Sequence, residues 1–199
     1  MTTLYLIRHG QTQWNVEGKY TGQSDIPLTD VGREQARAAA EPVKSAPPAA
    51  VYASDLIRAR ETAELFAAGC DFTGAIQLDP RLREINQGVW EGMHFNDIKA
   101  KFAEEFAARE ANPLEVAAPG GETVGEVQQR VIAAVKAICA RHPQEIVAIV
   151  AHGLALAIIR AWLTNHPIQD VWSLIPPNAH VLIYELELSD GRPRRFSSN

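Results

Sequence analysis

The chain has 199 residues, of which 46% are hydrophobic and 22% are charged, and its formal net charge at pH 7 is -5. This length and composition are typical of a single globular domain and argue against an intrinsically disordered chain. The excess of acidic residues disfavours general nucleic-acid binding, which needs a basic surface, but it leaves room for a local cationic pocket.

The two cysteines, Cys70 and Cys139, are far apart in segments with helical patterns. A disulfide framework or a cysteine metal site is therefore not expected, and we predict two free thiols. No apolar run reaches the roughly 18 residues of a membrane span, and the apolar stretch over 4–7 is too short for a signal peptide. We expect a cytoplasmic protein without a membrane partner.

The first half of the chain alternates short apolar runs with helical patterns. Thr29 and Ser54 are suitable N-caps, and Pro42 should kink or end the helix that contains it. In chain order, the pattern predicts a strand over 3–8, a loop over 9–28, a helix from 29 to about 45, a strand over 50–53, a helix over 55–68 and a strand over 75–78.

The second half continues the alternation, with one longer insertion. It predicts a loop over 80–93, a helix over 95–110, a break at 119–121, a helix over 123–141, a strand over 146–151, a helix over 153–164 and an edge strand over 179–188. The strand over 146–151 is continuously apolar, as in a parallel sheet that is covered on both faces.

The alternation predicts an α/β fold, a three-layer α/β/α sandwich with a mostly parallel central sheet and an edge strand near the C-terminus. We expect residues 1–190 to form one catalytic domain, in which about 90–120 insert as a cap over the pocket. The tail over 191–199 is open to disorder.

Residues with useful chemistry follow the predicted strands. Arg8 and His9 end the first strand, Arg58 lies in the first turn of the helix after the second, Glu84 follows the third, and His152 ends the fourth. Because ligands bind at the carboxyl ends of parallel strands, we expect these side chains to converge at one edge of the sheet.

Two arginines favour an anionic ligand, most simply a phosphate, and a helix N-terminus near Arg58 adds backbone donors. A histidine between such cations should stay neutral and nucleophilic, and a nearby carboxylic acid could protonate a leaving oxygen. Each residue alone could also have an ordinary structural role; Arg58, for example, could pair with Glu61 or Glu64. The catalytic interpretation therefore depends on the whole set and on the motifs around it.

The motifs resemble those of the histidine phosphatase superfamily, also called the phosphoglycerate mutase-like family. The matching blocks occur in the family's order over about residues 4–160. They are Leu-Ile-Arg-His-Gly-Gln-Thr from residue 6, Leu-Thr-Asp-Val-Gly-Arg-Glu-Gln-Ala from 28, Ser-Asp-Leu-Ile-Arg-Ala-Arg-Glu-Thr-Ala from 54, Leu-Arg-Glu-Ile from 82, Pro-Gly-Gly-Glu-Thr from 119 and Val-Ala-His-Gly from 150.

The resemblance implies a role for each catalytic candidate. His9 would be the nucleophile that becomes phosphorylated, while Arg8, Arg58 and His152 would hold the phosphoryl oxygens. Glu84 would protonate the leaving group and then activate water. The resemblance and the placement of the motifs also make Gln11, Asn15, Thr21, Gly22 and Gly153 candidates for binding the substrate phosphate.

We expect no metal and no cofactor, because two arginines would repel a cation. The remaining histidines, His94, His142, His166 and His180, do not form a ligand cluster in the sequence.

The sequence favours the phosphatase branch of the family over its mutases. The mutases usually have an arginine directly after the proton-donor glutamate and a later arginine pair, whereas here Ile85 and Asn86 follow Glu84. The bases that do occur in this region, Lys99, Lys101 and Arg109, have spacings typical of solvated helix faces. The function predicted is therefore a metal-independent phosphomonoesterase, with a cofactor-dependent phosphoglycerate mutase or a non-catalytic phosphate-binding domain as alternatives.

The partner expected is a small phosphorylated metabolite, and a sugar phosphate, a phosphoglycerate and α-ribazole phosphate all remain open. We expect the phenylalanines of 95–110 to pack their helix onto the sheet, and Trp90 to be available to an apolar substrate group. The oligomeric state is open, with a homo-oligomer as one alternative, because Trp172 and Ile175 could belong to the core or to an interface.

Overall fold

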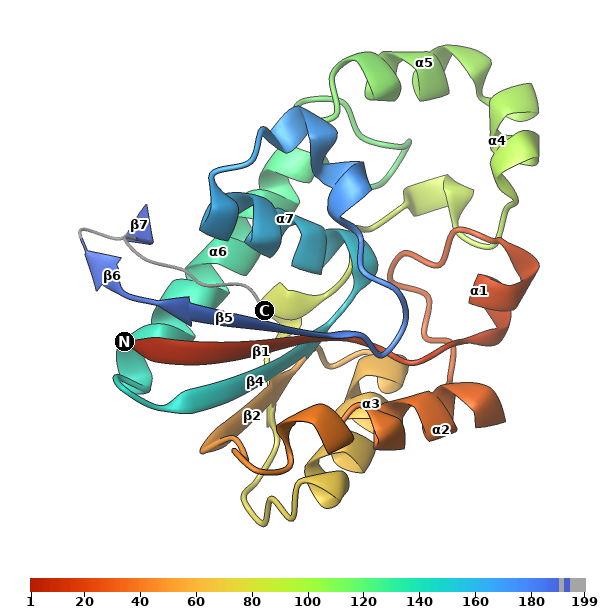
Figure 1. Ribbon diagram of the computed structural model, residues 1–199. Coiled ribbons are helices and arrows are strands. Elements are labelled where there is room, and N and C mark those ends of the chain that lie inside the picture. Colours follow the sequence, from red (N-terminus) through yellow and green to blue (C-terminus); the bar gives the residue numbers. More distant parts are fainter. Residues whose placement is uncertain (190–191, 194–199) are drawn as a thin grey trace.

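The computed structural model describes residues 1–189 and 192–193, and its centre is a five-stranded sheet in the order β3-β2-β4-β1-β5. The strands are β1 (Thr2–Arg8), β2 (Ala50–Ala53), β3 (Gln77–Leu78), β4 (Ile146–Ala151) and β5 (Val181–Leu186). The first four strands are parallel, and β5 runs antiparallel to β1 at one edge (Figure 1). The predicted mostly parallel sheet with a C-terminal edge strand is confirmed.

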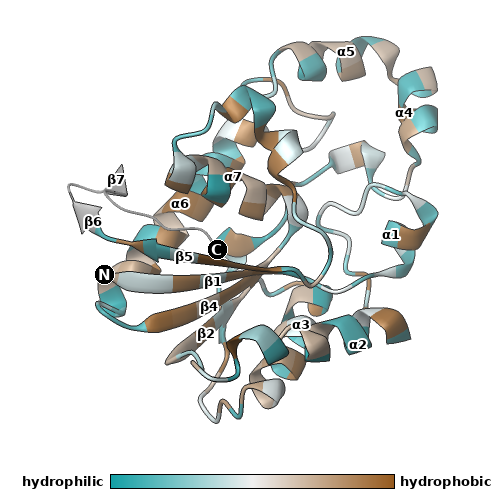
Figure 2. Ribbon diagram, in the orientation of Figure 1, coloured by the Kyte–Doolittle hydropathy of each residue, from teal (hydrophilic) through white to brown (hydrophobic). Residues whose placement is uncertain are grey.

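Helices cover both faces of the sheet and form the outer layers of the sandwich. Helices α2 (Asp30–Ala38) and α3 (Ile57–Gly69) lie on one face, and α6 (Val124–Arg141) and α7 (Gly153–Thr164) lie on the other (Figure 1). Two clusters of buried apolar side chains fill the spaces between the layers. Figure 2 shows that the central strands are the most hydrophobic part of the molecule, as double coverage requires.

The helix starts follow local capping chemistry, with one correction. The Thr29 side chain accepts a hydrogen bond from Gly32 N at the start of α2, as expected. The N-cap of α3 is Leu56 rather than Ser54, so that prediction is wrong. The Ser54 hydroxyl instead accepts from Leu56 N, which closes a turn one step before the helix.

Two further differences concern residues 9–45. The segment predicted as a loop over 9–28 contains a short helix α1 (Gln13–Glu17), because Thr12 and Asn15 form a reciprocal capping box. Helix α2 ends at Ala38, and Pro42 lies in a separate 3₁₀ turn, Glu41–Val43, rather than in a kinked continuation.

The segment predicted as a cap contains two helices instead of the single one predicted over 95–110, and we call these two helices the cap. Helix α4 (Phe95–Lys101) and helix α5 (Ala103–Ala111) meet at Phe102, whose backbone is not helical (φ -130, ψ 43). Phe102 and Phe106 pack around Trp90 in a separate cluster away from the sheet, so the expected packing of the helix onto the sheet is wrong. The two helices arch above the carboxyl end of the sheet (Figure 1).

After α7, the chain forms a 3₁₀ segment, Ile168–Leu174, before β5, and then a small antiparallel pair, β6 (Leu188–Ser189) and β7 (Arg192–Pro193). Apart from residues 192–193, the tail over 191–199 lies outside the described residues. Within the described ranges, no helix is long and apolar enough to cross a membrane. Cys70 and Cys139 are buried free thiols, as expected.

Candidate active site

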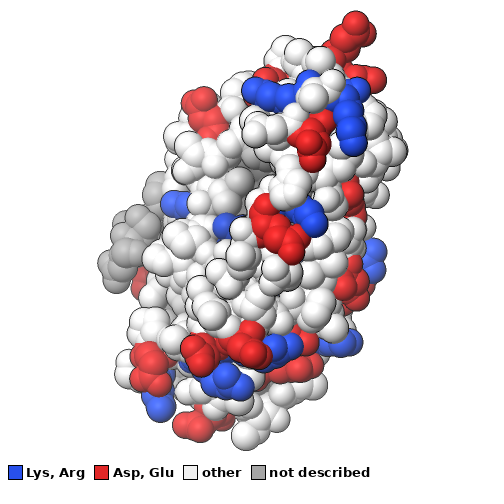
Figure 3. Space-filling view, turned by 90° about the vertical axis from the view of Figure 1, so that its right-hand side faces the viewer, with Lys and Arg blue, Asp and Glu red and all other residues white. Residues whose placement is uncertain are grey.

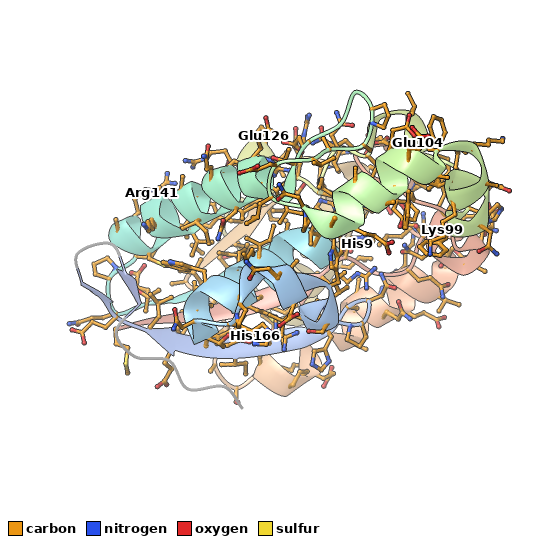
Figure 4. The ribbon with its side chains drawn as sticks, turned by 90° about the horizontal axis from the view of Figure 1, so that it is seen from above. His9, Lys99, Glu104, Glu126, Arg141 and His166 are labelled. Carbon is orange, nitrogen blue, oxygen red and sulfur yellow. The ribbon has the colours of Figure 1, made fainter. Side chains whose placement is uncertain are left out.

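A cavity of about 300 Å³ lies at the carboxyl edge of the parallel strands. Figure 4 labels His9 at this end of the sheet, beside the cap helices that carry Lys99 and Glu104. The walls of the cavity come from β1, α1 and the loop after it, the start of α3, the loop after β3, the start of α7 and the segment before β5. The lining residues are Arg8, His9, Asn15, Lys19, Tyr20, Thr21, Gly22, Arg58, Glu84, Ile85, Gln87, Leu154, Trp172 and Ile175.

His9 directly follows β1, and its ring is fixed by its own backbone. Nδ1 lies 2.7 Å from the carbonyl oxygen of Gly10, which can only accept, so Nδ1 carries the proton and Nε2 has the free lone pair. Burial, and then the charges of Arg58 and Arg8, hold the pKa of His9 well below 6.5. A neutral imidazole with a defined tautomer is the form that can attack phosphorus.

His152 follows β4 as the N-cap of α7, and its ring centroid lies 5.2 Å from that of His9. It is fully buried, and neither ring nitrogen has a hydrogen-bond partner among the described residues. Burial is the main cause that lowers the pKa of His152 well below 6.5, followed by the Arg58 charge. His152 is therefore a neutral group beside His9 with unused hydrogen-bonding capacity.

Arg8 and Arg58 are held by backbone carbonyls. Arg8 Nη1 donates to Pro176 O (2.7 Å), and Arg58 donates to Ser24 O (2.8 Å) and Gly22 O (2.7 Å). Burial lowers the pKa of Arg58 to about 10 and lowers the pKa of Arg8, so Arg58 stays largely charged at neutral pH. Neither Nε atom has a partner within residues 1–189 or 192–193, which leaves donors for an anion.

Glu84 reaches the cavity from the loop after β3, and backbone N–H groups hold its carboxylate. Oε2 accepts from Leu154 N (3.0 Å), while Oε1 accepts from Ala155 N (3.3 Å) and Ile85 N (3.0 Å). Leu154 and Ala155 are in the first turn of α7, where the helix dipole favours a negative group. The same turn that follows His152 thus positions the carboxyl group of Glu84.

The other candidates for phosphate binding divide into two groups. Asn15, Thr21 and Gly22 line the cavity, as the motifs predict. Gln11 is not part of the lining; its side-chain oxygen accepts from the Thr29 hydroxyl (3.1 Å). Gly153 lies behind Arg8, since a Cβ placed on it would come within 3.5 Å of Arg8 Cζ.

Glu91 stabilises one wall from outside the cavity. Its carboxylate accepts from the backbone N–H groups of Gln23 and Ser24 (both 2.8 Å) and of Gln87 (3.1 Å). Gly22 has a positive φ of 53°, and a Cβ there would collide with Glu91. Glu91 is therefore a structural carboxylate that holds the loop to which Arg58 is anchored.

Sequence reasoning missed several residues of the site. Asn178 Nδ2 donates to the carbonyl oxygen of His9 (3.0 Å) and approaches Asn15 Oδ1 (3.3 Å), so it links β1 to the cavity wall. Tyr20, Trp172 and Ile175 line the cavity, and Ile175 also packs against the hydrophobic core. No local signal identifies these positions, because each reaches the site from a loop or a 3₁₀ segment.

Trp90 is fully buried next to Tyr20 and Phe106 and does not line the cavity, so the expectation that it is available to substrate is wrong. Figure 3 looks onto the carboxyl edge of the sheet and shows charged side chains over the cap, over α2 and α3, and in a smaller group between them. Acidic and basic side chains are mixed on this face, which carries no large patch of basic side chains alone.

The family assignment follows from comparison with known proteins. Residues 4–199 match the family model of the histidine phosphatase superfamily (branch 1). The chain belongs to the histidine phosphatase superfamily. This confirms the resemblance seen in the motifs.

Relatives within the superfamily carry both mutase and phosphatase names. The probable phosphoglycerate mutase GpmB of Enterobacter sp. (strain 638) is 39% identical over 84% of this chain and 77% of that protein. YhfR of Bacillus stearothermophilus is 38% identical, with a TM-score of 0.86 over 98% of this chain and 95% of that chain. A mycobacterial glucosyl-3-phosphoglycerate phosphatase is 30% identical, with a TM-score of 0.86 over 99% of this chain and 97% of that chain.

The buried histidines predict an acid sensitivity of the fold. Below about pH 6.5 both histidines become protonated in the unfolded chain but stay neutral in the folded protein, where their pKa values are lowered. Their contribution to the free energy of unfolding is therefore fully present above about pH 6.5 and is lost as the pH falls toward the folded pKa values. His152→Gln should lower the slope of unfolding free energy between pH 6.5 and 5, by up to about 1.4 kcal/mol per pH unit. Denaturant unfolding in phosphate-free buffer measures this slope.

His94→Gln is the matched control, because His94 is exposed and should leave the slope unchanged. The comparison uses slopes, since the glutamine at 152 also alters packing. Equal slopes for wild type and His152→Gln would show that His152 is not held neutral by the fold.

Proposed function

We propose that this chain is a phosphomonoesterase that hydrolyses small phosphorylated metabolites through a phosphohistidine on His9, with Glu84 as proton donor. One observation carries the proposal: the free Nε2 side of a neutral His9 shares a single cavity with the buried guanidinium of Arg58, the half-buried guanidinium of Arg8 and one carboxyl group. These are the nucleophile, the anion-binding groups and the acid that phosphoryl transfer requires.

In the first step, His9 Nε2 attacks phosphorus, and the bond from phosphorus to the ester oxygen breaks. Arg8 and Arg58 bind the equatorial oxygens, where negative charge is spread in the transition state. His152 can use its unpartnered nitrogens on the same group. Glu84 delivers a proton to the leaving oxygen, so the alcohol departs neutral and Glu84 remains as a carboxylate.

In the second step, water attacks the phosphohistidine, and the bond between nitrogen and phosphorus breaks. The Glu84 carboxylate takes a proton from the attacking water, which restores the acid for the next cycle. His9 returns to its neutral state, with its proton still on Nδ1 and hydrogen-bonded to Gly10 O. The three N–H donors around Glu84 keep its carboxyl group in place through both roles.

Hydrolysis is favoured over mutase transfer by two observations. Some of the solved relatives that match nearly the whole chain are phosphatases by name, including the α-ribazole phosphatase of Shigella flexneri (28% identical, TM-score 0.84). Glu84 is followed by Ile85 and Asn86, without the arginine that is usual in the mutases. A mutase remains the second candidate, because GpmB relatives share up to 39% identity with this chain.

The first test is product formation. We expect the purified chain to release inorganic phosphate from p-nitrophenyl phosphate at an unchanged rate in excess EDTA, because the arginines supply the positive charge. With 3-phosphoglycerate and a bisphosphoglycerate primer, we expect phosphate release rather than 2-phosphoglycerate. Rapid formation of 2-phosphoglycerate would favour the mutase, and loss of activity in EDTA would contradict metal independence.

The second test asks whether Glu84 is the proton donor to the leaving group. Glu84→Gln should lower kcat/KM for an alkyl phosphate by about 10²–10⁴-fold, the usual contribution of general acid catalysis. It should lower kcat/KM for p-nitrophenyl phosphate far less, because nitrophenolate leaves without a proton. We use kcat/KM because it covers the steps up to phosphoenzyme formation.

Glu104→Gln on the exposed side of α5 is the matched control and should leave both substrates unaffected. If Glu84→Gln lowers kcat/KM equally for both substrates, Glu84 is not the general acid.

A further inference from the structure

A second cavity, of about 210 Å³, lies beneath the cap and adjoins the catalytic cavity. Tyr20 and Trp172 line both cavities, so together they form the boundary between them. The remaining walls are Phe95, Phe106, Arg109 and Glu110, all from α4 and α5. A substrate that places its phosphate beside His9 therefore has a ready space for the rest of the molecule.

The second cavity is built mainly from aromatic rings. Phe95 and Phe106 pack edge to face at 5.3 Å, and Phe106 in turn contacts Trp90. Phe95 and Trp172 are nevertheless 41% and 43% exposed, although large aromatic side chains gain most from burial. A flat apolar group between these rings would cover them, and the volume suits a ring system of one or two rings.

Two charged residues interrupt this aromatic wall: Glu110, which is exposed, and Arg109, which is only 5% exposed. Nη1 donates to Gln87 Oε1 (2.7 Å), a neutral acceptor. Nη2 is buried without a hydrogen-bond partner among the described residues. A buried guanidinium with an unused donor is costly, so the fold retains here a group that a ligand can satisfy.

The electrostatic surroundings of Arg109 favour an anion as that ligand. Its guanidinium lies over the faces of Trp90 (5.2 Å) and Trp172 (5.6 Å), and burial lowers its pKa from the usual arginine value. Ring faces offset only part of a buried charge.

Arg109 is also connected to the chemistry of the site. Its acceptor, Gln87, lines the catalytic cavity together with Glu84. The sequence predicts Arg109 on a solvated helix face, and the structure corrects this: Arg109 faces inward from α5 toward Gln87 and Trp172.

We propose that the second cavity is a binding site for the leaving group of the substrate, and that it selects a flat, largely apolar alcohol carrying an anionic acceptor, such as a carboxylate, for Arg109. This proposal rests on the proposed phosphomonoesterase function and adds a specificity-determining residue to it. The phosphate lies between Arg8 and Arg58, the ring passes between Tyr20 and Trp172, and the anionic end meets Arg109.

The test compares 2-naphthyl phosphate with 6-carboxy-2-naphthyl phosphate. Arg109→Met should lower kcat/KM for the carboxylated ester by roughly tenfold or more, the usual effect of losing a charge-assisted hydrogen bond. It should change kcat/KM for the plain ester by less than about threefold on the same scale. Dividing the kcat/KM of the variant by that of the wild type on the same ester cancels the intrinsic reactivity of that ester.

Three further variants separate the recognition of the carboxylate by Arg109 from general effects on the cap. Arg109→Lys keeps the charge without the planar fork, so it should fold and show an intermediate loss with the carboxylated ester. Lys101→Met removes an exposed charge from the cap and should leave both esters unaffected. Phe95→Leu, at an exposed position in the cavity wall, should lower kcat/KM for both naphthyl esters relative to kcat/KM for glycerol phosphate.

A binding measurement separates this proposal from the proposed function. Calorimetry with the non-hydrolysable 6-carboxy-2-naphthylmethyl phosphonate needs no turnover, and inorganic phosphate serves as the reference for the phosphoryl site. Arg109→Met should lower the affinity for the phosphonate but not the affinity for inorganic phosphate. If Arg109→Met lowers the affinity for the phosphonate and for phosphate equally, or lowers neither, the proposed leaving-group site is wrong even if the protein is a phosphatase. If binding changes as expected but no ester is hydrolysed, the proposed catalytic function is wrong and the leaving-group site stands.

Discussion

The site depends on two guanidinium groups, the buried Arg58 and the half-buried Arg8, that lie beside two buried histidines. The carbonyl oxygens of Pro176, Ser24 and Gly22 accept hydrogen bonds from Arg8 and Arg58 and offset the cost of removing their charges from water. The loops that carry these carbonyls must therefore be in place before the pocket exists. The same burial and the same charges hold both histidines neutral, which gives His9 its nucleophilic form.

The parallel sheet supplies the geometry for this cluster. Strands β1 and β4 are neighbours and in register up to the pair Arg8 and Ala151, so the residues that follow them emerge side by side. Helix α7 then begins immediately, and its first N–H groups hold Glu84. Nucleophile, anion-binding groups and proton donor thus converge from the ends of β1 and β4, the starts of α3 and α7 and the loop after β3, as ligand sites of open α/β sheets do.

The sequence predicts the inner site better than its periphery. Arg8, His9 and His152 end buried strands, and apolar runs locate buried strands well, so their convergence follows from the sheet alone. Arg109 and Trp172 could not be placed this way. Arg109 has the spacing of a solvated helix residue, and its burial depends on how the cap and a distant 3₁₀ segment meet, which no local pattern encodes. Local chemistry was also missed, as in the capping box that forms α1.

The identity of the phosphorylated residue is the most direct measurement of the proposed chemistry. Labelled substrate, mixed rapidly with enzyme and quenched without acid, should leave the label on His9, and His9→Ala should retain the fold while losing both label and turnover. Asn15 and Glu84 should remain unlabelled. Stable label on a serine, aspartate or glutamate, or full turnover by His9→Ala, would contradict the central role of His9.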